Sequence, residues 1–232
     1  MKGEEIREMV KSAGELQRKG ELEKGLEVLR RAEEKIKLLP ENEAIESLLG
    51  LIRHYEGRTL QAMEEHREAD KRYREAYLLR RKNPVQRAYT AFQIFINQDY
   101  GEIPISVSEI EATKKDIWEA INAAQEPGQI GDFFQNLAYI TQYQKDIKRA
   151  IWFYQVAEVF RGIANDERGF VLTWARLGEC HVQTGDVEKA REYGEKALKY
   201  FEGIPGVREP DPERIKQVKE NIFAKIQEKE KK

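Results

Sequence analysis

The chain has 232 residues, 40% of them hydrophobic and 35% charged, which is enough apolar material for a core beneath an ionic surface. Lys and Arg total 40 against 42 Asp and Glu, so the net charge of -2 excludes a whole-chain field that attracts nucleic acid or an anionic membrane. The single cysteine, Cys180, excludes an internal disulfide and a thiolate metal site. No segment approaches the roughly 20 apolar residues that cross a bilayer, and the N-terminus lacks a secretory apolar core. We therefore expect a cytoplasmic protein with no membrane partner.

Long segments with apolar residues at every third or fourth position fill the chain, and the few prolines and glycines fall between them. This spacing predicts helices throughout. The best strand candidate, residues 103–107, contains a proline and runs directly into the helical pattern of Ile110, Ile117 and Ile121. We interpret it as the start of a helix.

Five copies of one pattern follow each other along the chain, of which two are weak, one is degenerate and two are clear. The first weak copy has Ala13, a turn at Gly20, Gly25 and Ala32. The second has Leu49 and Gly50, a turn at Gly57, Ala62 and Ala69. The degenerate third copy needs Gly101 and Ser106.

The two clear copies lie in the C-terminal half. One has Phe134, Leu137, a turn at 145–146, Ala150 and Ala157, and the next has Trp174, Leu177, Gly185, Ala190 and Ala197. Leu137 precedes Ala150, and Leu177 precedes Ala190, by 13 residues each. Two copies with the same spacing indicate a genuine repeat.

This pattern resembles the tetratricopeptide repeat, a helical hairpin in which small residues let two helices cross closely. The small anchor residues of the second helices are predicted to be Gly25, Ala62, Ser106, Ala150 and Ala190, separated by 37, 44, 44 and 40 residues. These separations exceed the usual 34, and we place the extra residues in a long linker around 163–169. Long-repeat variants are found in families similar to kinesin light chains and bacterial peptide-sensing regulators, which bind peptides or proteins.

The resemblance implies an all-α fold, a right-handed α-solenoid of about five hairpins that forms a single domain over 1–232. The predicted repeats cover residues 5–38, 42–82, 84–124, 131–164 and 168–203. A capping helix is expected over 211–229, because Asp211 and Pro212 form a helix start signal before an apolar stripe of Ile215, Val218, Ile222 and Ile226.

In such a solenoid the first helix of each hairpin lines a concave groove, so the resemblance also implies groove positions. The most relevant are amide, aromatic and charged residues of the last two repeats, namely Gln135, Asn136, Tyr139, Gln142, Tyr143, Arg176, Glu179 and Gln183. The third repeat adds Ala91, Phe95 and Gln98, and the second Ser47, Leu51 and His54. Amides and tyrosines suit the main chain of an extended peptide.

A subset of the family clamps chaperone C-termini with Lys and Arg at fixed groove positions. Here only Asn136 and Arg176 match, whereas the other three positions hold Ala91, Phe95 and Leu172, which bind no carboxylate. The sequence therefore disfavours a chaperone-tail clamp.

A basic run with interleaved tyrosines is the main alternative surface. Its cations could contact phosphates while Tyr73 or Tyr77 stacks on a base, and they are Lys71, Arg72, Arg74, Arg80, Arg81 and Lys82. The alternative interpretation is a solvated helix face balanced by the acidic residues Glu64, Glu65 and Glu68. We favour the solvated helix face.

Catalysis has little support in the sequence. The three histidines lie in different predicted helices without metal-ligand spacing, and adjacent Cys180 and His181 diverge by about 100° on a helix. Cys180 and the tryptophans Trp118, Trp152 and Trp174 are predicted to be core residues. We therefore expect no enzyme, no cofactor and no metal.

The sequence leaves three hypotheses open. The first is a scaffold or adaptor that binds a peptide or a helix of a partner protein in its groove. The second is an RNA-associated protein that uses the basic helix at 71–82. The third is a structural repeat protein that self-associates as a homo-oligomer.

Overall fold

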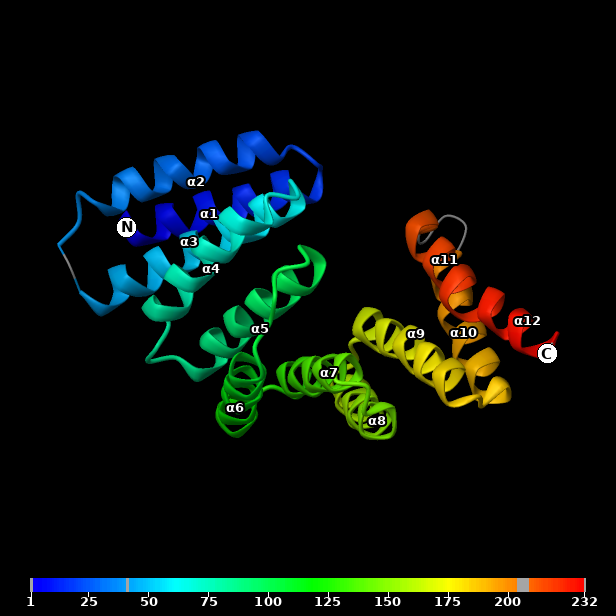
Figure 1. Cartoon of the computed structure of the whole chain (residues 1–232). Coiled ribbons are helices and arrows are strands. Elements are labelled where there is room, and N and C mark those ends of the chain that lie inside the picture. The colour runs from blue at the N-terminus through cyan, green and yellow to red at the C-terminus, as the bar shows by residue number, and fades with distance from the viewer. Residues whose placement is uncertain (1, 41, 204–208, 232) are drawn as a thin grey trace. The chain divides into compact units, whose positions relative to one another are not determined.

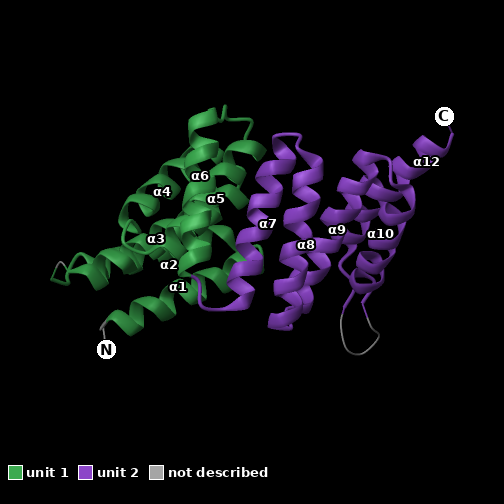
Figure 2. Cartoon of the chain, turned by 90° about the horizontal axis from the view of Figure 1, so that it is seen from below, with its two compact units in different colours: residues 1–123 green, residues 124–232 purple. Residues whose placement is uncertain are grey.

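The computed structural model describes residues 2–40, 42–203 and 209–231, and within these ranges it contains helices and their connections but no β-strand. The chain divides into two compact units, Met1–Ala123 and Ala124–Lys232, which Figure 2 colours separately. Of the helices in the described ranges, none is both long enough and apolar enough to span a bilayer. The fold is therefore all-α, as the sequence predicts.

Unit 1 consists of helices that pair with their neighbours along the chain. The pairs are α1 (Lys2–Arg18) with α2 (Leu22–Ile36), α3 (Glu43–Ala62) with α4 (His66–Leu79), and α5 (Pro84–Tyr100) with α6 (Val107–Ala123) (Figure 1). Side-chain caps fix two of the helix starts, because Asn42 accepts from the amide of Ile45 and Asn83 accepts from that of Gln86. The degenerate third copy thus forms a complete helix pair.

Unit 2 contains two further pairs and the C-terminal helical segment. The pairs are α7 (Pro127–Tyr143) with α8 (Ile147–Ala164) and α9 (Glu167–Thr184) with α10 (Val187–Phe201). The chain then continues through α11 (Pro212–Val218), a π-helical turn η1 (Lys219–Ala224) and α12 (Lys225–Glu230).

The turn inside each hairpin has the same construction. One residue adopts a left-handed conformation, and the next amide bonds to a carbonyl five residues back, as in the pair Asp186 and His181 at 3.0 Å. The left-handed residues are Gly20, Glu64, Glu102, Lys145 and Gly185, with φ of 77°, 63°, 52°, 65° and 83°. Only two of them are glycines, so three hairpins turn without the residue that usually marks such a position.

The predicted turn at Gly57 is wrong. Gly57 lies inside α3 and is buried against the ring of Tyr73, where an added Cβ would approach Tyr73 Cδ1 to 2.7 Å. The glycine is therefore needed for the close approach of α3 and α4, and the turn occurs seven residues later at Glu64.

Two of the predicted anchor residues are also misplaced. Ala62 is the last residue of α3, and Ser106 lies before α6, where its Oγ accepts from the amide of Glu109 and its amide donates to the Glu109 carboxylate. The anchors lie four residues into each second helix, at Gly25, Ala69, Ile110, Ala150 and Ala190, which gives separations of 44, 41, 40 and 40. All five are buried.

The long linker predicted at 163–169 does not form. Only Asn165 and Asp166 separate α8 from α9, because Asn165 ends α8 in a left-handed conformation and Asp166 caps α9 by accepting from the amide of Gly169. The extra residues lengthen the helices instead, since α8 and α9 have 18 residues each.

The C-terminal segment covers α9 and α10 with the predicted apolar stripe. Val218, Ile222 and Ile226 are 4%, 0% and 1% exposed. Ile222 packs where α9 and α10 carry glycines, and a Cβ at Gly178 would lie 2.6 Å from Ile222 Cδ1. The capping helix therefore seals the apolar face of the last hairpin.

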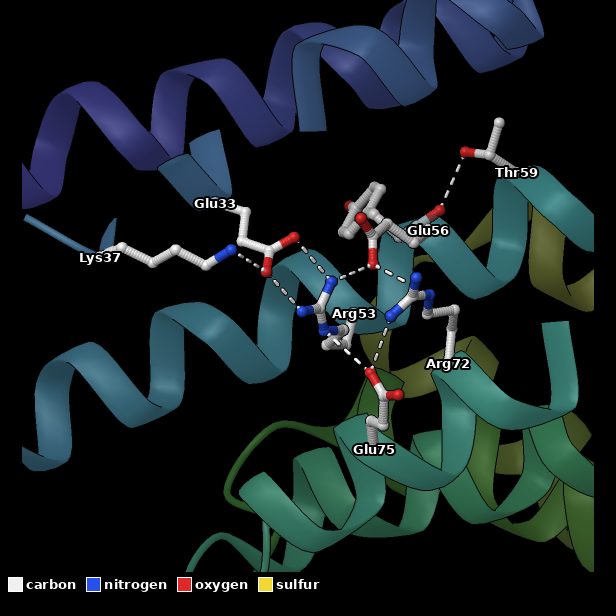
Figure 3. A network of polar contacts seen from close by, with 8 residues as sticks. Glu33, Lys37, Arg53, Glu56, Thr59, Arg72 and Glu75 are labelled. Carbon is white, nitrogen blue, oxygen red and sulfur yellow. Dashed lines mark hydrogen bonds and ion pairs between the residues drawn. The ribbon is translucent and has the colours of Figure 1, made fainter. Parts of the chain in front are cut away.

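A polar network links the first two hairpins of unit 1 (Figure 3). The Arg53 guanidinium of α3 contacts carboxylates on three helices, those of Glu33 at 2.6 Å, Glu56 at 2.7 Å and Glu75 at 2.9 Å. The Arg53 side chain is only 13% exposed, and burial alone would disfavour its charge; the Glu33 and Glu56 carboxylates outweigh this and raise its pKa.

We predict that Gly57→Ala lowers the free energy of unfolding by about 1–3 kcal/mol, because the new methyl group overlaps the buried Tyr73 ring. The matched control is Gly162→Ala on the exposed side of α8, where a Cβ would lie 3.4 Å from Phe170. There, helix propensity predicts no loss or a gain of up to about 1 kcal/mol. Chemical denaturation of both variants measures the difference, and equal stabilisation by both would contradict the packing argument.

Candidate functional site

Most of the predicted groove residues lie on α7 and α9, the first helices of the two hairpins in unit 2. The guanidinium of Arg176 on α9 lies over the ring of Tyr139 on α7, with the guanidinium carbon 5.2 Å from the ring centroid. Tyr143 follows Tyr139 by one helical turn and is 39% exposed, and Gln183 lies exposed near the end of α9. These residues form what we call the α7–α9 face: Tyr139, Tyr143, Arg176, Glu179 and Gln183.

Contacts within unit 2 hold Arg176 in place. Its Nη1 lies 2.8 Å from a Glu179 carboxylate oxygen, and the other oxygen of Glu179 accepts from Asn221 Nδ2 of η1 at 3.1 Å. Burial works against the charged guanidinium, but Glu179 and the hydroxyls of Tyr154 and Tyr139 together raise the pKa of Arg176. The cation is therefore fixed in position and permanently charged.

The predicted amides are mostly engaged within the protein, contrary to the prediction that they meet a peptide. Gln135 Oε1 accepts from Thr173 Oγ1 at 2.9 Å, and Gln142 Oε1 accepts from the hydroxyl of buried Tyr154 at 3.1 Å. Asn136 is 8% exposed. The Gln135 and Gln142 contacts position α7 against α9 and α8, and Asn136 is buried in α7.

Residues predicted from the third repeat are core residues of unit 1. Phe95, Ala91 and Gln98 are 1%, 4% and 2% exposed, so Phe95 is not available to a peptide. They line a small hollow of about 150 Å³ between α4, α5 and α6. The helices on both sides of α5 cover the face that the resemblance assigned to the groove.

The second repeat contributes residues of three kinds. Ser47 is half-buried on α3, whereas Leu51 lines a hollow between α1 and α3. His54 is enclosed, with Nδ1 3.2 Å from Thr90 Oγ1 and its ring 5.6 Å from that of Tyr73. Burial, followed by the positive charges of Arg80 and Arg58, lowers the pKa of His54 well below its usual value.

The predicted basic patch is largely neutralised by carboxylates of unit 1. The partners are Glu75 for Arg72, Asp70 and Glu109 for Arg74, Glu46 for Arg81 and Glu43 for Lys82, while Lys71 is exposed. Arg80 is 5% exposed and donates to Thr90 Oγ1 at 2.7 Å, and burial lowers its pKa to about 10. Tyr73 is fully buried and donates its hydroxyl to Gln61, so it cannot stack on a base.

The prediction of three core tryptophans is wrong for two of them. Trp118 is 41% exposed and Trp152 is 53% exposed, whereas Trp174 is partly buried and donates its indole N–H to Glu158 at 2.7 Å. Trp152, Val159 and Ile163 lie on one exposed side of α8. Helix α8 is apolar on both sides, so its periodicity does not reveal which side is buried.

Cys180 is a packing residue, as the sequence predicts. Its side chain is completely buried, and burial, followed by the Glu179 carboxylate, raises the pKa of its thiol to about 12. The neighbouring His181 stacks on Tyr193 instead, with centroids 5.7 Å apart. Within the described ranges, no group of three or more His, Cys, Asp and Glu side chains is arranged to hold a metal ion.

We predict that His54 makes the stability of the protein depend on pH. The unfolded chain takes up a proton near pH 6.5, but the folded state does not because its His54 pKa is lower. Stability is therefore lost as the pH falls below about 6.5, by up to ~1.4 kcal/mol per pH unit. In His54→Gln, the loss of unfolding free energy between about pH 7.5 and about pH 5.5 should shrink by about 1 kcal/mol. An unchanged difference between the two pH values would refute this assignment.

We predict that the Cys180 thiol is inert in the folded protein, because a buried thiol with its pKa near 12 presents almost no thiolate near neutral pH. An aromatic disulfide reagent should label it only after denaturant is added, and the released thiolate is measured by absorbance. Complete labelling of the native protein at the rate of a free thiol would show that the residue is accessible and reactive.

The comparisons with known proteins agree with this architecture. Residues 171–204 match the family described as tetratricopeptide repeat. No curated protein matches the chain significantly. Among solved structures, BtubC (BKLC) from P. vanneervenii has a TM-score of 0.68 at 16% identity, covering 85% of this chain and 80% of that one.

Two further structures have the same fold. The putative kinesin light chain TPR-like repeats of Podosopora anserina give a TM-score of 0.59 at 12% identity, covering 84% of this chain and 94% of that one. The Rap conjugation gene regulator of plasmid pLS20, in complex with the Phr* peptide, gives 0.61 at 15% identity, covering 84% and 53%. The chain thus spans about half the length of the Rap proteins that it matches. Residues 171–204 thus carry a tetratricopeptide repeat, and the chain as a whole has the fold of helical-hairpin repeat proteins of this type.

Proposed function

We propose that this protein is an interaction scaffold that holds an extended peptide of a partner protein on the α7–α9 face. The observation that carries the proposal is the contact between Tyr139 and Arg176, which joins two neighbouring first helices into one aromatic and cationic surface. Tyr143 and Gln183 extend this surface with exposed side chains at the C-terminal ends of α7 and α9.

The physical chemistry of the α7–α9 face suits peptide binding. Tyr and Arg are enriched among residues that dominate interface energies, because they bury a large flat area and donate hydrogen bonds. The Glu179 and Asn221 contacts hold Arg176 before any partner arrives, so little side-chain entropy is lost on binding. Gln183 can donate to and accept from a peptide main chain.

Analogy at the level of the fold points the same way. The Rap regulator with a similar fold is described in complex with a peptide, and tetratricopeptide hairpins generally bind proteins without catalysing reactions. Fold alone does not specify a ligand, so the proposal depends on the α7–α9 face itself.

The test uses peptides selected by display on the wild-type full-length chain. We predict that Tyr143→Ala combined with Gln183→Ala weakens their binding about tenfold or more, which corresponds to about 1.4 kcal/mol or more. The matched control is Tyr100→Ala, which removes a tyrosine that is 58% exposed in unit 1. Fluorescence anisotropy measures the affinities, and circular dichroism checks that each variant is folded.

Two outcomes would contradict the proposal. One is that the selected peptides bind the double variant as tightly as the wild type, and the other is that Tyr100→Ala weakens binding equally. A further variant, Tyr139→Phe, retains the ring over Arg176 and should retain most of the affinity.

A further inference from the structure

Unit 1 has a hollow of about 430 Å³ between α1 and α3, the first helices of its first two hairpins. Four cations line this α1–α3 hollow, Arg7, Lys11 and Arg18 from α1 and Arg58 from α3, and its described lining contains no carboxylate. The whole chain carries 40 basic and 42 acidic residues. Four cations in a lining without a carboxylate are therefore a local departure from an even balance.

The arrangement follows from helical spacing. Residues 7, 11, 14 and 18 recur at intervals of three or four, so they lie on one side of α1. At the third of these positions Gly14 makes room for Tyr55 of α3, since a Cβ there would lie 2.9 Å from the ring. Val10, which is 2% exposed, and Leu51 complete an apolar floor beneath the cations.

The protein's own carboxylates leave these cations largely uncompensated. Lys11 has one ion pair, with Glu8 at 3.8 Å, in which both side chains are about two-thirds exposed and the attraction is weak. Within the described part of the chain, no carboxylate forms an ion pair with Arg7, Arg18 or Arg58. Glu5 is turned away from the hollow, because it pairs with Lys35 of α2. The basic run at 71–82 differs in this respect, since carboxylates neutralise most of its cations.

The spacing of the cations fits an extended acidic chain. At 1.5 Å per residue, Arg7 and Lys11 are separated by about 6 Å along α1, and Lys11 and Arg18 by about 10 Å. Side chains on one side of an extended peptide recur about every 7 Å. Carboxylates at alternate positions therefore share one side of the segment and can lie against successive cations.

We propose that the α1–α3 hollow binds an extended acidic peptide segment of a partner protein. Carboxylates of the segment contact Arg7, Lys11, Arg18 and Arg58. This site belongs to unit 1 and is separate from the α7–α9 face, so either site can exist without the other.

A peptide fits this site better than a nucleic acid. Proteins that bind single-stranded nucleic acid stack bases on aromatic rings, and Tyr55 is the aromatic ring of this hollow. The Arg58 guanidinium covers that ring at 5.3 Å from its centroid, and the backbone at Gly14 lies against its edge. Arg58 thus lies over this one ring, whereas successive bases of a single strand stack on several aromatic rings.

The test measures binding of short labelled probes to the full-length chain by fluorescence anisotropy. The probes are a peptide containing Glu-Leu-Glu-Ala-Glu, its Gln-Leu-Gln-Ala-Gln counterpart, and an oligouridylate of the same net charge as the acidic peptide. We predict that the acidic peptide binds at least tenfold more tightly than the other two, and that its affinity falls as salt is added.

Two double variants locate the site. Arg18→Gln combined with Arg58→Gln should weaken binding of the acidic peptide about tenfold or more. Arg30→Gln combined with Arg31→Gln, which removes the same charge from exposed positions on α2, should change it little. Tyr143→Ala should also leave it unchanged, which separates this proposal from the one for the α7–α9 face.

The proposal is overturned if the acidic peptide does not bind, if its glutamine counterpart binds equally, or if both double variants weaken binding to the same extent. Tighter binding of the oligouridylate would also overturn it and would identify a phosphate site. Circular dichroism and thermal unfolding check that each variant retains the fold.

Discussion

The close crossing of the two helices in each hairpin is the constraint on which the rest of the structure depends. Where the helices cross, the second helix carries a small buried residue, and Ala69, Ala150 and Ala190 are all completely buried. Any larger side chain would separate the backbones and open a void. The third hairpin has Ile110 at this position, and its connection is longer, because the anchor follows the left-handed residue by eight positions instead of five. Gly57 and Gly178 extend the same principle to the contacts with Tyr73 and Ile222.

Ion networks fix the helices once the small residues have brought them together. Arg53 joins α2, α3 and α4, and Arg161, which is 6% exposed, contacts Asp132 of α7 at 2.6 Å and also Asp166 before α9. Gly169 leaves the space that the Arg161 guanidinium occupies. Both networks place each arginine among carboxylates from more than one element. The cations of the α1–α3 hollow stand out because no comparable set of carboxylates faces them.

The two candidate surfaces share one structural origin and differ in chemistry. Both are formed by first helices of neighbouring hairpins, whose second helices provide the packing behind them. The α7–α9 face combines tyrosines with an arginine that is held in place, whereas the α1–α3 hollow combines four cations with an apolar floor. A repeat scaffold can carry both kinds of surface, because the anchor residues that determine the hairpin are different from those that face outward.

The sequence alone determined the all-helical repeat, the last two hairpins, the capping helix and the buried Cys180, because each depends on local spacing or on apolar periodicity. It did not locate the turns at Glu64 and Glu102, because a left-handed residue other than glycine carries no distinct signal. It also misassigned Phe95 and Trp152, since a helix that is apolar on both sides does not show which side its neighbours cover. Only the tertiary structure decided that Gln135 and Gln142 accept hydrogen bonds from Thr173 and Tyr154. It also decided that Arg7, Lys11 and Arg18 line the same hollow as Arg58. These pairings join residues from different helices, and no local pattern records which helices become neighbours.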